Sequence, residues 1–66
     1  MWIVIELQTD ENGKVANIVT SHESRNEAES KYHQILSAGA ISSIPTHSAV
    51  MLDERGNLEK SEYYLH

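Results

Sequence analysis

The first eight residues alternate between two faces of an extended strand, as the side chains of a β-strand do. One face is apolar and consists of Met1, Ile3, Ile5 and Leu7. The other face mixes apolar and polar side chains and consists of Trp2, Val4, Glu6 and Gln8. Solvent suits Trp2 poorly and a dry core suits Glu6 poorly, so we expect this mixed face to contact something specific.

A β-hairpin is predicted around the sequence DENGK, which separates the β-rich segments 3–9 and 15–20. Asn12-Gly13 favours a two-residue type I′ turn, because both central residues of that turn need a positive φ. With this turn Leu7 faces Ile18, and the apolar face of the first strand meets Ala16 and Ile18. The mixed face then meets Val15, Asn17 and Val19 of the second strand.

An amphipathic helix is predicted to follow the first hairpin. Ser24 and Glu27 have the spacing of a capping box, in which each side chain satisfies a backbone N–H group at the helix start. A single helical stripe has the spacing of a buried face and consists of Ala28, Tyr32, Ile35, Leu36 and Gly39. Pro45 must lie beyond the helix, because proline disrupts a helix interior.

A second hairpin is predicted around DERGN, between segments 47–52 and 58–65. A two-residue Arg55-Gly56 loop places His47 opposite Tyr64 and Ala49 opposite Glu62, and a four-residue loop is the alternative. The segment 48–52, SAVML, is apolar on both sides, as expected of a central strand that is covered on both faces.

These elements predict an α+β fold with the order ββαββ, in a single domain over residues 1–66. Four antiparallel strands would lie in the order 2-1-3-4, with one helix packed on one face of the sheet. The other face is expected to expose Trp2, Val4, Val15 and Val19. An apolar patch of this kind predicts a partner, and a second copy of the chain is the simplest one.

Length and composition strengthen the expectation of a homo-oligomer. A chain of 66 residues buries only about 60% of its unfolded surface, and such small domains usually need disulfides, a metal or oligomerisation. The sequence contains no cysteine, so oligomerisation is the remaining common route to stability.

Charge and hydropathy argue against two classes of partner. Ten acidic and five basic residues give a net charge of −5, and the bases are scattered, so we expect no nucleic-acid binding. No segment approaches the ~18 apolar residues of a membrane span, and the first residues lack the features of a signal peptide. We therefore expect a cytoplasmic location and no membrane partner.

No residue pattern indicates a cofactor, a metal centre or a nucleophile. The four histidines form no H-x-x-x-H or H-x-H pair, and neither G-x-S-x-G nor a phosphate-binding glycine loop occurs. Glu29 and His33 are spaced i, i+4, but zinc sites normally need three or four protein ligands, so a solvated pair is the simpler interpretation. We expect no cofactor and no metal, and we do not favour an enzyme.

Candidate ligand-binding residues gather on the mixed face. Trp2 can stack on a planar ring while Glu6, Gln8 and Asn17 hydrogen-bond to its edges, in a pocket between subunits. The alternative is a wet interface without a ligand, because interfaces carry many polar contacts of their own.

Three further residues complete the predicted ligand-binding set. His47, opposite Tyr64, is either a general base or ligand-binding group, or a partly buried histidine with a purely structural role. Arg25 lies near the helix N-terminus, where backbone N–H groups attract anions, although Glu23 and Glu27 occupy the same field.

A resemblance to a known group of proteins is carried by the pattern MWIVIELQT … NIVT … RNEAESKYH … AGAISSIPTHSAVML … G … EYY. The chain resembles very short proteins that are encoded in prophages of gut Firmicutes and usually carry no assigned function. The resemblance covers nearly the whole chain. The ending YYLH departs from the pattern, which has an acid before the last histidine, and this puts any role of His66 in doubt.

The resemblance implies a stoichiometric role, as a virion accessory or as an inhibitor of host defence. One class of such inhibitors comprises oligomeric sponges that sequester cyclic-nucleotide or ADP-ribose-derived immune signals. A sponge of this kind would bind base and ribose through Trp2, Gln8, Asn17 and His47. Positive charge for the phosphates would come from Lys14, Arg25, Lys31, Arg55 or Lys60.

Three hypotheses for the function follow. The first is a non-enzymatic homo-oligomer that binds a small, nucleotide-derived ligand between subunits, as a counter-defence sponge does. The second is a protein-binding or virion accessory module whose acidic surface docks on a basic partner. The third is a small acid–base enzyme that uses His47 or Glu6, and it is the least favoured because no nucleophile, metal or cofactor signature supports it.

Overall fold

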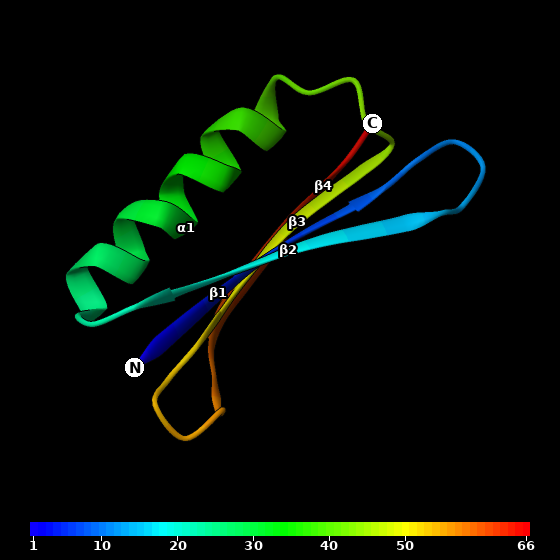
Figure 1. Cartoon of the computed structure of the whole chain (residues 1–66). Coiled ribbons are helices and arrows are strands. Elements are labelled where there is room, and N and C mark those ends of the chain that lie inside the picture. Colours follow the sequence, from blue (N-terminus) through cyan, green and yellow to red (C-terminus); the bar gives the residue numbers. More distant parts are fainter.

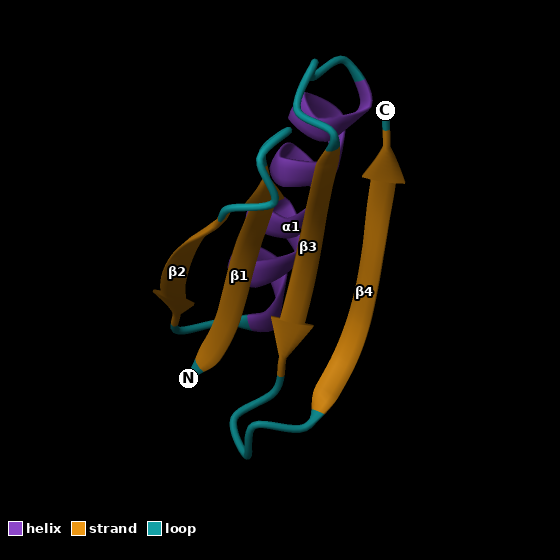
Figure 2. Cartoon of the chain, turned by 90° about the vertical axis from the view of Figure 1, so that its right-hand side faces the viewer, coloured by secondary structure: helices purple, strands orange, loops and turns teal.

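The computed structural model describes all 66 residues as four strands and one helix. The elements in chain order are β1 (Trp2–Thr9), β2 (Val15–His22), α1 (Arg25–Ala40), β3 (Thr46–Leu52) and β4 (Leu58–Leu65). The strands form one antiparallel sheet in the order β2-β1-β3-β4 (Figure 2). Helix α1 lies on one side of this sheet only (Figure 1). The predicted fold class and strand order are confirmed.

Helix α1 begins and packs as its sequence predicts. Ser24 is the N-cap, and its hydroxyl oxygen accepts a hydrogen bond from the backbone N–H of Glu27 at 3.2 Å. This is one of the two bonds of a capping box. The predicted apolar stripe is confirmed, since the buried residues of α1 are Ala28, Tyr32, Ile35, Leu36 and Gly39.

The turn between β1 and β2 differs from the predicted type I′ turn. The N–H of Asp10 donates to the carbonyl oxygen of Lys14, and the N–H of Gly13 donates to the carbonyl oxygen of Asp10, both at 3.0 Å. The Asp10 carboxylate accepts the N–H groups of Asn12 and Lys14, each at 2.9 Å. Gly13 has φ +80° and no residue other than glycine has a positive φ, whereas a type I′ turn needs two such residues. The loop therefore has three residues, Glu11 to Gly13, and not two.

The extra loop residue shifts the pairing of β1 with β2 by one position. Leu7 lies opposite Asn17 and Glu6 lies opposite Ile18, so the predicted pairing of Leu7 with Ile18 is wrong. Successive side chains of a strand point to opposite faces, and a shift of one residue therefore exchanges the faces of β2.

The mixed face of β1, and not its apolar face, packs against α1. Val4 is fully buried in the core and Trp2 packs against that core. The β1–β3 register brings Met51 beside Val4 and Ala49 beside Glu6, so the two strands present their core residues on the same side. The prediction that the odd-numbered residues of β1 bury against the helix is wrong.

The second hairpin repeats the first turn but keeps the predicted register. Asp53 N–H donates to the Asn57 carbonyl oxygen at 2.9 Å, and Gly56, with φ +84°, donates to the Asp53 carbonyl oxygen at 3.0 Å. The loop thus has three residues. A β-bulge between Met51 and Leu52 offsets the extra residue, so His47 lies opposite Tyr64 as predicted.

The side of the sheet away from α1 carries no other element (Figure 1). We call it the open face. Its apolar residues are Ile3, Ile5, Leu7, Val15, Val19, Val50, Leu52, Leu58, Tyr63 and Leu65. Its polar residues are Thr9, Asn17, Ser21, Thr46, Ser48 and Ser61. The open face thus contains no charged residue, although the chain has fifteen.

The register of the first hairpin can be tested with introduced cysteines, because the chain has none of its own. We expect Leu7→Cys with Asn17→Cys to form an intrachain disulfide under mild oxidation, since directly opposed residues have Cβ atoms about 4.5–5.5 Å apart. Leu7→Cys with Ile18→Cys should stay reduced, because those side chains point to opposite faces. Non-reducing mass spectrometry at low protein concentration distinguishes the two, and the reverse result would restore the two-residue turn.

Candidate functional site: a buried histidine–carboxylate cluster

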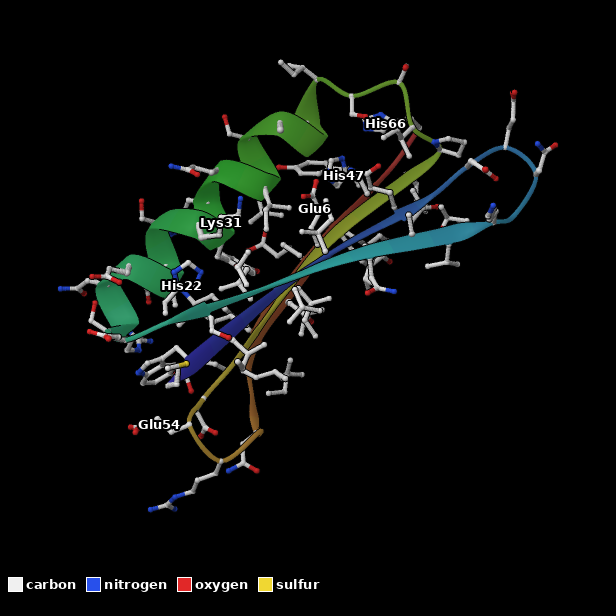
Figure 3. All side chains as sticks on the ribbon, viewed as in Figure 1. Glu6, His22, Lys31, His47, Glu54 and His66 are labelled. Atoms are coloured by element: carbon white, nitrogen blue, oxygen red, sulfur yellow. The ribbon has the colours of Figure 1, made fainter.

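The structure brings Glu6, Gln8 and His47 together between the sheet and α1 (Figure 3). His47 Nε2 lies 2.6 Å from Glu6 Oε2, and Gln8 Nε2 donates to the same oxygen at 3.0 Å. The β1–β3 register places Gln8 directly opposite His47, with Glu6 two positions along the same face. A carboxylate only accepts hydrogen bonds, so in this contact the N–H group at His47 Nε2 is the donor and Glu6 Oε2 is the acceptor.

Both members of this pair are largely buried. The side chain of His47 is 4% exposed and that of Glu6 is 15% exposed. Burial by itself raises the pKa of Glu6, but hydrogen bonds from Gln8 and His47 and the positive charge of Lys31 outweigh it. The pKa of Glu6 therefore lies below its ordinary value of 4.5, and the group is an ionised acceptor inside a largely dry layer.

The C-terminal end of α1 closes the cluster. A Cβ atom on Gly39 would lie 3.2 Å from His47 Cγ and 3.3 Å from Tyr64 Cδ2, so the helix backbone rests directly on these rings. His66 Nε2 lies 2.8 Å from the Gly39 carbonyl oxygen, and its ring stacks on that of Tyr64 with centroids 6.3 Å apart. A residue larger than glycine at this helix position would have to displace one of these two rings.

Two buried polar atoms near this layer have no hydrogen-bond partner, His47 Nδ1 and the Tyr32 hydroxyl. Burial, followed by the nearby charge of Glu62, raises the pKa of Tyr32, so its hydroxyl stays protonated. Buried groups of this kind commonly bind an ordered water or remain a local instability. His47 contacts Glu6 through Nε2, and its Nδ1 atom lies close to the backbone of α1 at Gly39.

Trp2 and Arg25 lie at the other end of the sheet–helix layer. The Arg25 guanidinium carbon is 5.9 Å from the centroid of the Trp2 ring. Arg25 also contacts Glu29 at 2.7 Å and Glu59 at 3.1 Å, and Lys60 reaches Glu29 at 3.2 Å. These ion pairs connect the first two turns of α1 to β4. Arg25 thus pairs with two carboxylates of the chain itself, at the position where the sequence suggested an anion could bind.

The predicted ligand site therefore divides into three places. Glu6, Gln8, His47 and Tyr64 come together under α1, and Trp2 lies with Arg25 beside the helix start. Asn17 lies on the open face, on the other side of the sheet. The prediction that Trp2, Glu6, Gln8 and Asn17 share the uncovered face is wrong for two reasons. The face of β1 that carries Trp2, Glu6 and Gln8 lies under α1, and the three-residue turn moves Asn17 to the opposite side of the sheet.

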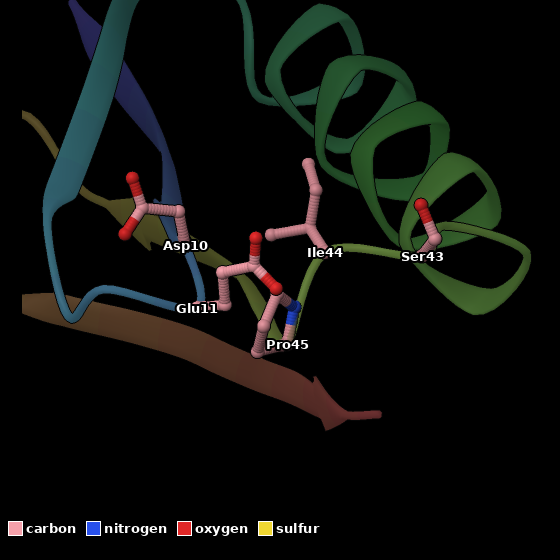
Figure 4. A pocket seen from close by; sticks show the side chains of 5 residues that line it. All are labelled: Asp10, Glu11, Ser43, Ile44 and Pro45. Carbon is pink, nitrogen blue, oxygen red and sulfur yellow. The ribbon is translucent and has the colours of Figure 1, made fainter.

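A hollow of about 300 Å³ lies at one end of the molecule (Figure 4). It lies between the β1–β2 turn and the segment before β3, and it is lined by Asp10, Glu11, Ser43, Ile44 and Pro45. None of the predicted ligand-binding residues lines it, and its two carboxylates disfavour a phosphate group. No group of three or more His, Cys, Asp or Glu residues is arranged to hold a metal ion.

The sequence carried a signal for the register that the Asn-Gly dipeptide obscured. Type I turns favour Asp at the first position and Gly at the fourth. This pattern occurs twice, from Asp10 to Gly13 and from Asp53 to Gly56. The position of Gly39 over His47 had no comparable signal, because it depends on how the helix lies on the sheet.

Gly39→Ala tests the contact between α1 and His47. In an open helix this change stabilises by about 1 kcal/mol, but a Cβ atom at 3.2 Å from His47 should instead destabilise by about 1–3 kcal/mol. Urea unfolding followed by circular dichroism, at one fixed protein concentration, measures the change. Ser37→Ala, at an exposed position of the same helix, is the control and should change stability little. An unchanged or more stable Gly39→Ala protein would refute the close contact.

The Glu6–His47 pair should make stability depend on acid pH. Because the pKa of Glu6 is lower in the folded chain, the unfolded chain binds the proton first as the pH falls. The stabilisation is present above pH 4.5 and is lost as the pH drops through the lowered pKa. Glu6→Gln should flatten the slope of unfolding free energy against pH in this range, while Glu11→Gln, at the exposed turn, should leave it steep. Part of the slope should remain, because hydrogen bonds from Asn57 and Arg55 lower the pKa of Asp53 as well.

Comparison of the chain with protein-family models, with curated proteins and with solved structures gives no match. The one helix, α1, has neither the length nor the apolar character needed to span a membrane. The features of the chain that bear on its function are therefore the two faces of the sheet and the buried cluster of Glu6, Gln8 and His47.

Proposed function

We propose that this protein is a non-enzymatic binding protein that works as a homo-oligomer, with subunits joined through the open face. The observation that supports this most directly is the composition of that face. It combines ten apolar side chains with six uncharged polar ones, and several are highly exposed, including Tyr63 at 65% and Leu65 at 70%. Exposed apolar patches of this extent are typical of interaction surfaces.

The distribution of charge supports a second copy as the partner. With a net charge of −5, two copies of the chain repel each other at most orientations. The charged residues lie on the turns, on α1 and on the helix-facing side of the sheet. Contact through the open faces is thus the arrangement that desolvates no charge.

The size of the face is just large enough for a specific contact between two copies. Four strands about 4.8 Å apart and about eight residues long, at roughly 3.3 Å per residue, give about 500 Å² for each copy. Two copies would bury about 1,000 Å², the lower limit for a specific interface. The isolated chain also needs the contact, because only nine of its 66 residues are buried.

A small, nucleotide-derived ligand between subunits is the binding activity we propose for this oligomer. Tyr63 lies opposite Ser48, and Leu7 lies between Ser48 and Asn17, so one aromatic ring and two hydrogen-bonding side chains share the open face. Such a group suits a base and its ribose. The counter-defence role rests on the prophage resemblance, and a virion accessory or other protein-binding module is the alternative.

Tyr63→Asp tests the oligomer. We expect wild-type protein to have a mass of at least two chains by light scattering, and the variant to dissociate at least about tenfold more readily, because each interface would then bury two carboxylates that have no partner. Ile41→Asp is the matched control, since Ile41 is 89% exposed but lies outside the open face. A wild-type mass of one chain up to about 1 mM, or an unchanged Tyr63→Asp mass, would exclude association through this face.

The ligand is tested separately on the same protein. Native mass spectrometry of protein purified from infected or signalling cells should show added mass, and a panel of nucleotides should include one that raises the unfolding temperature. A clean ligand-free oligomer with no thermal shift would remove the ligand and favour the protein-binding alternative.

A further inference from the structure

Strand β2 forms one edge of the sheet, and it lacks the features that normally protect such an edge. Six of its eight residues are exposed. Residues 15–21, VANIVTS, contain no charge, no proline and no glycine, and β2 pairs with β1 without a bulge. Free strand edges in native proteins are usually blunted by charged residues, proline or a bulge, because unpaired N–H and C=O groups attract another strand.

The opposite edge, β4, has these protective features. It carries Glu59, Lys60 and Glu62, and the β3–β4 pairing contains a bulge. The two edges of the same sheet therefore differ in their suitability for pairing. Within an acidic chain, β2 is the edge at which a second copy meets no repelling carboxylate.

The backbone of β2 has its free hydrogen-bonding groups in a regular row. Asp10 and Lys14 are a hydrogen-bonded pair, and hydrogen-bonded and non-hydrogen-bonded pairs alternate along an antiparallel ladder. The even-numbered residues of β2 therefore bond to β1. Outward N–H and C=O groups belong to Val15, Asn17, Val19 and Ser21.

Ile18 identifies the centre of a symmetric contact. Its side chain is 53% exposed and lies on the helix side of the sheet, so association through the open face would not cover it. A two-fold axis at Ile18 would place Asn17 opposite Val19 of a second copy as a hydrogen-bonded pair. The two Ile18 residues would then form a non-hydrogen-bonded pair with Cα atoms about 4.5 Å apart, where side chains pack closely.

We propose that β2 is a second self-association surface, at which the β2 strands of two copies pair antiparallel about Ile18 into one eight-stranded sheet. This pairing is independent of the open face and does not interfere with it. Val15 and Val19 belong to both the edge strand and the open face, so edge pairing makes two open faces into one continuous apolar surface. With both contacts, the assembly closes at four copies when the two axes cross at right angles.

Amide hydrogen exchange tests the edge pairing directly in wild-type protein. The amides of Val15, Asn17, Val19 and Ser21 should exchange on the order of 100-fold slower than the amide of Glu11, which is the exposed residue of the β1–β2 turn whose N–H makes no hydrogen bond. These N–H groups lie in the plane of the sheet, so a contact on the open face alone would not protect them. Fast exchange at these four amides, with slow exchange at Ala16, Ile18 and Thr20, would overturn the proposal.

Asn17→Pro provides the second test, because it removes an outward N–H and proline is tolerated on an edge strand. We expect light scattering to show half the wild-type mass for this variant. Asn17→Ala, which keeps the N–H, should retain the full mass, and circular dichroism confirms that both are folded. Ile18→Lys, which places like charges at the axis, should act as Asn17→Pro does.

The outcomes separate the two surfaces. If Tyr63→Asp lowers the mass while Asn17→Pro and Ile18→Lys do not, the open face stands and edge pairing is refuted. If the two β2 variants lower the mass while Tyr63→Asp does not, edge pairing stands and the proposed open-face oligomer fails. A wild-type mass of one chain refutes both. Protected β2 amides that come from pairing with another protein would appear as a second polypeptide in native mass spectrometry, and this too overturns the proposal.

Discussion

The Asp10 carboxylate holds the turn on which the arrangement of this small domain depends. It accepts the N–H groups of Asn12 and Lys14, each at 2.9 Å, and so supports a three-residue loop with Gly13 as the only residue at positive φ in the turn. Loop length sets the register of a hairpin, and register decides which side chains share a face. A local hydrogen-bonding preference at one aspartate thus determines which residues of β2 lie under the helix and which lie on the open face.

The pairing of β1 with β3 and the position of α1 on one side of the sheet separate charge from apolar surface. Glu6, a charged residue in the middle of β1, lies under α1 where His47 and Gln8 satisfy it, so no uncompensated charge is buried. With that carboxylate accommodated inside, the open face is left without charge. The buried cluster follows from the β1–β3 pairing and the position of α1, while the β1–β2 turn decides which residues of β2 complete the open face.

The two hairpins differ in how well their turn sequences predict the strand register. Each turn has Asp at its first position and Gly at its fourth, and each forms the same three-residue loop. The predicted strand register was wrong for the first hairpin and correct for the second. In the second hairpin the bulge between Met51 and Leu52 offsets the extra loop residue, so His47 still faces Tyr64. The predicted register of the second hairpin is therefore correct only because the longer loop and the bulge compensate each other. The bulge depends on how β3 and β4 pack, and no residue pattern in this sequence predicts it.

The sequence by itself determined the elements, their order, the fold class and the buried stripe of α1, because apolar periodicity and capping act over a few residues. It also determined that one sheet face would remain uncovered, since a single helix covers only one. Only the tertiary structure decided which face that is. It also decided that Gly39 lies on His47 and that Glu6 is paired inside. These features arise from contacts between strands and helix, where a shift of one residue exchanges the two faces of a strand.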